Sequence, residues 1–193
     1  MGFISNAARK ATSQSSKGGY LAIKKDKIGD KIRFKILSEE PLEFWEVWGT
    51  PPDGGKDKPF RFVAQPNPSE IRDELGEYSQ ALAFGSTTDL RAPSFCLAMF
   101  VWDYEDEGVK VLQLTQKGLI NELDMVSQTE EYAVVQEHDM QITYKGKDNG
   151  WYSLMPLASK KGCEEQIKEA WDAAQNQDWS LQQLIVGGSP FGA

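Results

Sequence analysis

The chain of 193 residues has little of the chemistry that metal sites and disulfide frameworks require, since it contains only two cysteines and one histidine. Cys96 lies in an apolar run and Cys163 in a polar one, which is not the pattern of a disulfide framework and indicates a reducing, cytoplasmic setting. With so few sulfur and imidazole ligands, we expect no zinc site. No cofactor is predicted either.

Long hydrophobic runs are also missing. No apolar stretch approaches the roughly 20 residues that a membrane-spanning helix needs. The first ten residues are too short and too polar for a secretory signal. We therefore expect no membrane partner and a protein that stays in the cytoplasm, that of the host cell if the protein is viral.

The chain lacks an excess of positive charge, because its formal net charge is −8. This total disfavours a nucleic-acid partner, whose affinity comes largely from Lys and Arg side chains that displace counterions. The charge is unevenly distributed, however: residues 1–35 hold nine Lys and Arg against two Asp, whereas residues 162–193 hold one Lys against five Asp and Glu. The sequence therefore has a basic start and an acidic end.

Catalytic signatures are absent as well. The only histidine, His138, forms an imidazole–carboxylate neighbour pair with Asp139, without a nucleophile motif beside them. The glycines around Lys147 lack the spacing of a phosphate-binding loop. We predict that the protein is not an enzyme, with a nuclease that uses carboxylate metal ligands as the alternative.

Alternating hydrophobicity predicts strands in the first half of the chain. From residue 31 to 37, Ile32, Phe34 and Ile36 fall on one side and cations on the other, which is the period of a half-buried strand. Further strands are expected over residues 42–48 and 60–63, separated by a turn-rich loop. Residues 69–83 show helical spacing.

The second half combines an apolar strand with helices and a hairpin. Residues 94–102 are typical of a central strand covered on both faces, with residues 109–115 as the other strand of its hairpin. Helices are expected near residues 119–126 and 167–174. The segment 140–156 reads as two strands joined by a Gly- and Asn-rich turn.

This order predicts a mainly β protein with inserted helices (α+β), specifically an OB-type five-stranded Greek-key barrel with a C-terminal helical tail. The predicted domains are a flexible basic tail over residues 1–18, a nucleic-acid-binding domain over 19–160 and an acidic, partly helical tail over 161–193.

Cations and aromatic residues share the same predicted strands, which suits a single nucleic acid strand. Such a strand needs Lys and Arg to follow its phosphates and rings on which its bases stack. The alternative is a purely structural role, in which the cations keep an exposed side soluble and the rings fill the core. Trp102, at the end of an apolar strand, fits that alternative best. The candidate phosphate contacts are Lys31, Arg33, Lys35, Arg61, Lys145 and Lys147, and the candidate stacking residues are Trp45, Trp48, Trp102 and Tyr144.

Three segments together resemble the OB-fold single-stranded DNA-binding proteins of tailed bacteriophages, over roughly residues 19–158. They are the basic strand 29–37 followed by the aromatic strand 44–48, the apolar strand 95–102 and the late hairpin 142–156. The zinc insertion that some relatives carry has no counterpart, because residues 50–93 contain no cysteine.

The resemblance implies sequence-tolerant binding and protection of single-stranded DNA during replication or recombination. It also implies contact with replication proteins through the C-terminal tail. RNA binding and a homo-oligomer are left open. The alternative from another class is a phage structural or assembly protein that uses the β domain for protein contacts.

Overall fold

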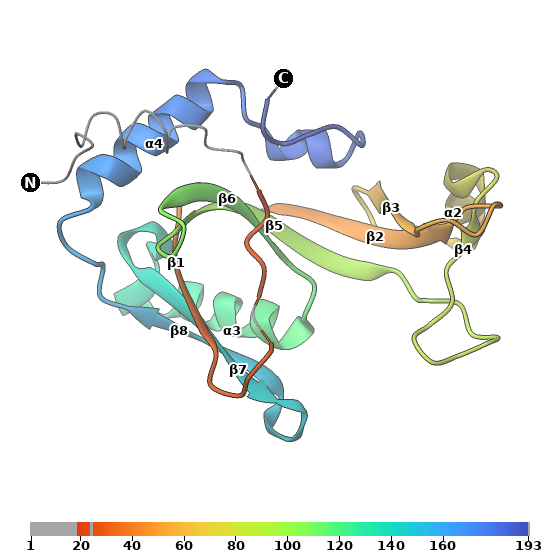
Figure 1. Ribbon diagram of the computed structural model, residues 1–193, viewed down its shortest axis with the longest axis horizontal. Helices are drawn as coiled ribbons and strands as arrows, with labels where there is room; N and C mark the ends of the chain where they lie inside the picture. Colours follow the sequence, from red (N-terminus) through yellow and green to blue (C-terminus); the bar gives the residue numbers. More distant parts are fainter. Residues whose placement is uncertain (1–18, 24, 193) are drawn as a thin grey trace, which may run out of the picture.

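The structure is a computed structural model that describes residues 19–23 and 25–192. The predicted tail over residues 1–18 lies outside the described residues. An open antiparallel sheet of eight strands forms the centre, and helices cover both of its faces (Figure 1). The α+β prediction is confirmed.

The predicted elements are present, with adjusted bounds. The strands are β1 Lys31–Ile36, β2 Leu42–Thr50, β3 Lys58–Phe62, β4 Ser79–Gln80, β5 Ser94–Asp103, β6 Gly108–Leu114, β7 Asp139–Gly146 and β8 Trp151–Leu157. The α-helices are α2 Pro68–Leu75, α3 Lys117–Gln128 and α4 Glu164–Asn176, and short 3₁₀ turns span Glu130–Tyr132, Val135–Glu137, Lys147–Asn149 and Leu181–Leu184.

Strand β5 holds the sheet together because both of its edges are paired. Along one edge it pairs first with β2, where Ala98 faces Leu42, and then with β1, where Val101 faces Ile36. Its other edge pairs with β6 over seven residues, which confirms the predicted hairpin. The sheet order is β3-β2-β5-β1-β7-β8, with β6 added to β5 and β4 to β2.

The expected closed five-stranded barrel is not present. Within the described residues β6 and β8 do not pair with each other, so the sheet stays open. Helix α3 accounts for this opening, because its buried Leu119 and Leu123 share one core cluster with Leu114 of β6 and Leu154 of β8. The apolar side chains of α3 occupy the space between β6 and β8, which would be absent if these two strands paired.

Side chains of β5 alternate between two separate cores. Leu97, Met99 and Val101 face α3, together with the apolar residues of β1. Phe100 and Trp102, on the opposite face, pack with residues of α4. Because successive side chains of a strand point to opposite faces, this double coverage requires the continuous apolar run seen in the sequence.

The C-terminal segment is part of the packed fold and not a separate tail. Ile167 and Ala174 of α4 are buried, and so are Trp179 and Leu184 beyond it. The ring of Trp179 lies 6.0 Å from that of Phe100. The predicted helix is confirmed, but the predicted boundary at residue 160 does not coincide with a change in packing, because the apolar face of α4 covers the sheet.

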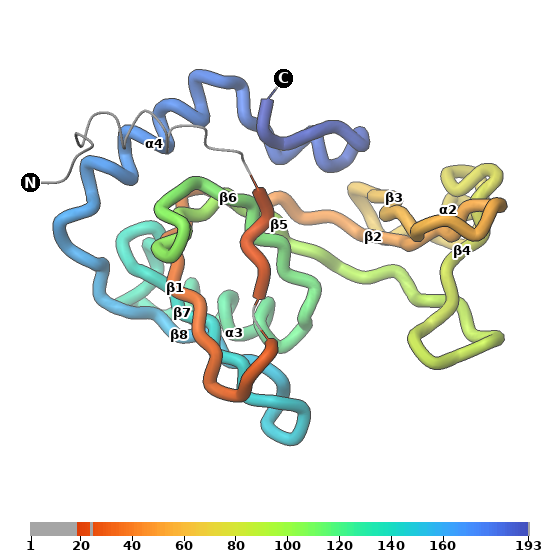
Figure 2. Tube along the Cα trace, viewed as in Figure 1, coloured from red at the N-terminus to blue at the C-terminus, as the bar shows by residue number. Residues whose placement is uncertain are grey.

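An arm extends from the sheet where β2 and β3 continue beyond β5 (Figures 1 and 2). Val47, Ile71 and Leu75 form its small core, with Tyr78 packed against them. Helix α2 is shorter than the predicted 69–83, because Gly76, with φ 56°, ends it.

The N-terminus of α2 also differs from the prediction. The capping residue is Asn67 and not Ser69: the Asn67 side chain accepts hydrogen bonds from the N–H groups of Ser69 and Glu70, and Glu70 in turn accepts from the N–H of Asn67. After the helix, Ser79–Gln80 pairs with β2 as β4.

Within residues 19–23 and 25–192, no helix has both the length and the apolar character that crossing a bilayer requires.

The packing of α4 predicts a loss of stability when its buried face is truncated. We expect Ile167→Ala to lower the free energy of unfolding by about 2–5 kcal/mol, because it leaves a cavity against the sheet. The neighbouring exposed Gln166→Ala serves as the matched control, with a change below about 0.5 kcal/mol. Urea denaturation measures both, and equal stability of the two variants would contradict the role of α4 as a cover.

Candidate nucleic-acid interface

The predicted binding residues lie on several surfaces and not on one concave face. They fall into three groups: the outward face of β1, the rings and the arginine of β2, β3 and β5, and the hairpin that joins β7 to β8. Only in the last group do exposed predicted cations lie beside a cluster of aromatic rings, in which the predicted Tyr144 is half-buried.

Arg33 on the outward face of β1 is engaged in an internal ion pair. Its Nε donates to Oδ2 of Asp139 at 2.7 Å, and its Nη2 donates to the carbonyl of Ala158 at 2.8 Å. The Asp139 side chain is fully buried, whereas that of Arg33 is 35% exposed. The guanidinium of Arg33 therefore neutralises the buried carboxylate of Asp139, and this internal role takes precedence over contact with a ligand.

Asp139 accepts two further hydrogen bonds. The Tyr104 hydroxyl donates to it at 2.8 Å and the Lys160 N–H at 3.0 Å. Burial, followed by the hydrogen bond to Asp139, raises the pKa of Tyr104 above its ordinary value of 10. The phenol therefore keeps its proton and remains a donor to the carboxylate.

Lys35, also on β1, donates from Nζ to Oγ of Ser159 at 3.0 Å. It lines a cavity of about 230 Å³ with Tyr104, Lys160 and Trp171 at the start of α4. Lys31, at the beginning of β1, is exposed. The predicted alternation of β1 is confirmed, because Ile32, Phe34 and Ile36 are all buried.

Arg61 on β3 joins the arm to the C-terminal segment. It lies 3.3 Å from Glu46 and donates to the carbonyl of Leu184 at 3.1 Å, while its guanidinium lies 5.5 Å above the ring of Phe44. Only 13% of its side chain is exposed. In this structure Arg61 therefore contributes to the packing of the arm against the C-terminal segment.

The three predicted tryptophans differ in their exposure. Trp102 is 1% exposed and belongs to the core against α4, so its ring is closed to base stacking in this conformation. Trp45 is half-buried, edge-on to Phe95 at 5.6 Å. Trp48 is half-buried beneath the guanidinium of Arg91, which lies 5.0 Å from its ring.

The β7–β8 hairpin gathers aromatic rings at one end of the sheet. The ring of Tyr144 lies 5.4 Å from Tyr152 and 6.5 Å from Trp151. Trp151 is 47% exposed. A register shift between Tyr144 and Gly146 leaves Lys145 as an extra residue in β7, and Lys145 and Lys147 are both exposed. The predicted hairpin is confirmed.

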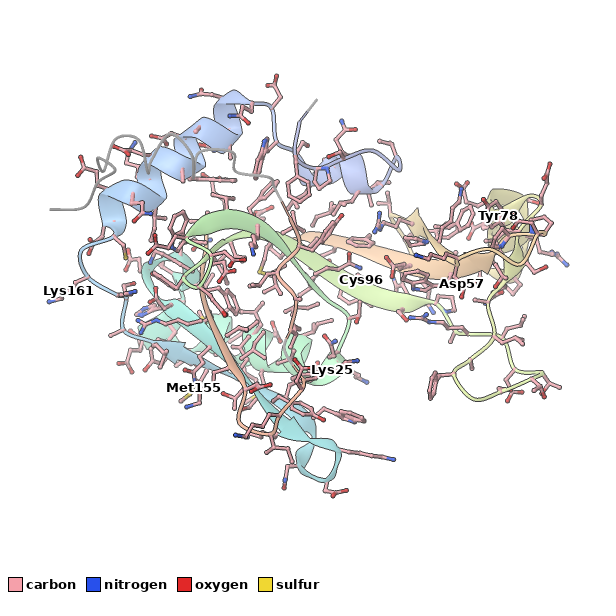
Figure 3. The ribbon with its side chains drawn as sticks, in the orientation of Figure 1. Lys25, Asp57, Tyr78, Cys96, Met155 and Lys161 are labelled. Atoms are coloured by element: carbon pink, nitrogen blue, oxygen red, sulfur yellow. The ribbon has the colours of Figure 1, made fainter. Side chains whose placement is uncertain are left out.

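The loop before β1 lies beside this hairpin (Figure 2). Gly29 N–H donates to the carbonyl of Tyr144 at 2.8 Å, and Tyr144 N–H donates to the carbonyl of Asp30 at 2.9 Å. Gly146, with φ 81°, allows close contact, because a Cβ there would come within 2.9 Å of Ile28. Figure 3 labels Lys25 on this loop and Met155 on the neighbouring β8.

The start of α3 completes the same surface. A cavity of about 360 Å³ lies between the two elements and is lined by Lys117 and Gly118 of α3 and by Trp151 and Tyr152 of β8. We call the whole patch the hairpin-tip surface; its members are Lys25, Lys27, Ile28, Lys117, Tyr144, Lys145, Lys147, Trp151 and Tyr152.

Charge on the hairpin-tip surface is opposite in sign to that of the chain. Its five lysines face Asp26, Asp30 and Asp148 from the same segments and Glu122 of α3, which accepts a hydrogen bond from the N–H of Leu154, and this leaves +1 locally in a chain of −8. The ion pairs seen among the described residues involve none of these lysines.

Sequence reasoning missed part of this surface. Lys25 and Lys27 were visible only as members of the basic N-terminal stretch, and nothing in the pattern placed Lys117 beside the hairpin. Trp151 lies within the predicted hairpin 140–156, but its position in the sequence does not distinguish an exposed ring from a core ring. Its 47% exposure is a consequence of tertiary packing.

A catalytic or metal site gains no support from the geometry. In the part of the chain that the structure describes, no three His, Cys, Asp or Glu side chains form a group that could hold a metal ion. The ring of His138 packs against Tyr132 at 5.0 Å, whereas its neighbour Asp139 binds Arg33. The two adjacent residues do not act as a pair.

Comparisons with protein-family models, with curated proteins and with solved structures found no match for this chain.

The Arg33–Asp139 pair predicts different roles for two cations of one strand. We expect Arg33→Ala to lower the free energy of unfolding by about 1–3 kcal/mol, because Asp139 loses its charged partner but keeps two donors. Lys31→Ala on the same face should change it by less than about 0.5 kcal/mol. Equal losses in chemical denaturation would contradict an internal role for Arg33.

The raised pKa of Tyr104 predicts a loss of stability at alkaline pH. Above pH 10 the unfolded chain releases the phenol proton while the folded chain retains it, so the unfolded state binds fewer protons and stability falls as pH rises. One such group contributes a slope of up to about 1.4 kcal/mol per pH unit. Tyr104→Phe should remove this component from unfolding free energies measured between about pH 10 and pH 11.5. An unchanged slope would refute the assignment.

Proposed function

We propose that this protein binds single-stranded DNA without sequence preference and without catalysis, and that the hairpin-tip surface is its principal contact. The supporting observation is the exposed ring of Trp151, which lies beside Tyr144 and Tyr152 and among lysines that make no ion pair with the described residues. Cations beside stacking rings are the chemistry that an unpaired strand requires.

The unpaired strand is favoured over a duplex by the form of the surface. Aromatic faces bind bases only when those bases are unstacked and accessible, as in a single strand. The hairpin tip consists of two strands and their turn, and only the first residues of α3, Lys117 and Gly118, line the cavity beside it. The resemblance to the single-stranded DNA-binding proteins of tailed phages, and with it an OB-type origin of the sheet, belongs to the same proposal.

The negative net charge is compatible with this proposal. Screening limits the reach of exposed charges to about 8–10 Å in physiological salt. The lysines at the hairpin tip therefore act on a bound strand more strongly than acidic residues at the far end of the molecule. Protection of exposed strands during DNA replication or recombination is the biological role that such binding would serve.

The proposal predicts a specific pattern of affinity losses. Trp151→Ala should weaken binding of a fluorescein-labelled thymidine oligonucleotide by about 5- to 150-fold, which corresponds to about 1–3 kcal/mol for one stacked base. Met155→Ala, at a similarly exposed position of β8, is the matched control. Fluorescence anisotropy at low salt measures both.

The salt dependence of the same binding curve distinguishes the contribution of the lysines to affinity from that of the aromatic rings. Each phosphate contact contributes about −0.7 to the slope of log K against log salt for a single strand. The double variant Lys145→Ala/Lys147→Ala should therefore reduce the magnitude of the slope by about 1.4. Lys56→Ala on the arm should leave it unchanged. Absence of binding in the micromolar range at low salt would refute the proposal, and an RNA oligonucleotide of equal length tests the preference for DNA.

A further inference from the structure

A cavity of about 360 Å³ lies beside the exposed Trp151, between the β7–β8 hairpin and the start of α3. Trp151 and Tyr152 line it from β8, and Gln116, Lys117 and Gly118 line it from the start of α3. We call it the hairpin cavity. A flat ring that enters it meets aromatic residues from the sheet and polar residues from the helix.

The size of the hairpin cavity suits one nucleobase. A cavity of about 150 Å³ is enough to hold a benzene molecule. A pyrimidine is similar in size to benzene, and a purine is larger by one fused ring. A volume of about 360 Å³ therefore has room for a single base of either class.

The backbone at Trp151 has a conformation that bulky residues rarely adopt. Its φ is 69°, and the φ of the preceding Gly150 is 78°. A positive φ is an outlier for a large side chain, and such outliers are found where the surrounding structure fixes them, often at ligand sites. Here the pairing of Trp151 with Gly146 and of Tyr152 with Tyr144 fixes the backbone. The indole is therefore already held beside the hairpin cavity, which reduces the entropy lost on binding.

The polar residues of the hairpin cavity suit any base. Oε1 of Gln116 accepts from the N–H of Thr115 at 3.3 Å, and its amide nitrogen can donate to the acceptors that bases carry at their edges. Lys117 is exposed and takes part in none of the ion pairs seen among the described residues. Glu122, one turn further along α3, accepts from the N–H of Leu154. An amide donor and one ammonium beside a ring give contact without a base-specific pattern.

From this arrangement, we propose that one base of the bound strand leaves the stack of its neighbours and enters the hairpin cavity, where it stacks on Trp151 and faces α3. The inference rests on the proposed function, which requires only contact with an exposed ring, and adds to it a defined position for one base. Taking a base out of a duplex requires unpairing and unstacking. The hairpin cavity therefore favours single strands.

Substitution of Gly118 tests the hairpin cavity without changing its rings or its lysine. A Cβ at this helical position meets no atom within 4 Å, so the side chain of Gly118→Leu has space to extend into the cavity. We expect Gly118→Leu to weaken binding of a short thymidine oligonucleotide by about 5- to 150-fold, the range for one stacked base. Gln128→Leu, which adds an exposed leucine at the other end of α3, is the matched control and should bind like the unmodified chain. Urea denaturation checks that both variants are folded.

An abasic strand separates base insertion from phosphate contacts. A chain of deoxyribose phosphates keeps the contacts with lysines but has no base to insert. It should bind the unmodified chain more weakly than the thymidine strand does. Gly118→Leu should bind it with the same affinity as the unmodified chain.

A single fluorescent base provides a measurement that does not depend on a variant. When one central 2-aminopurine is placed in the abasic strand, it is the only base available to the hairpin cavity. Its emission should fall on binding to the unmodified chain because the base stacks on Trp151. Acrylamide should quench the remaining emission less than in the free strand. In Gly118→Leu, acrylamide should reach the base as it does in the free strand.

The two proposals fail in different ways. If the thymidine strand does not bind the unmodified chain at low salt, both are overturned. If binding requires Trp151 but is equal in Gly118→Leu and Gln128→Leu, strand binding stands and the insertion of a base is overturned. A bound 2-aminopurine that acrylamide reaches as freely as in the free strand leads to the same conclusion.

Discussion

The fold depends on one strand that is buried on both faces and paired on both edges. β5 meets β1 and β2 along one edge and β6 along the other, and its alternating side chains enter two cores that share no residue. Each helix covers only one face of the strand. α3 and α4 are therefore both required for the sheet to exclude water from β5.

Buried carboxylates decide which cations remain available. Asp139 is fully buried and binds Arg33, and Glu46 is 3% exposed and pairs with Arg61. Burying either carboxylate without its arginine would destabilise the folded state. The main role of the two arginines is therefore to stabilise the fold. The lysines of the hairpin-tip surface face no such acid, which is why the proposed strand contact lies at the hairpin and not along β1.

Local pattern determined much of the secondary structure of this protein. The alternation at Ile32, Phe34 and Ile36, the apolar run of β5 and the hairpin at 140–156 each depend on side-chain spacing within a few residues, and each is present. The helix at 69–83 was predicted too long because Gly76 ends it and the following residues pair with β2. That pairing involves partners distant in sequence, which spacing does not encode.

Tertiary structure alone decided the opening of the sheet, the packing of the C-terminal segment and the ion pairing of the cations. Whether the sheet closes depends on where α3 packs, and whether residues 161–192 form a tail depends on what the apolar face of α4 meets. The same limit applies to the site: Arg33 and Lys145 are both cations on strands, but only the first has a buried carboxylate beside it. Sequence fixes residue type and period, whereas burial and ion pairing come from contacts such as Arg33–Asp139, between residues more than a hundred positions apart.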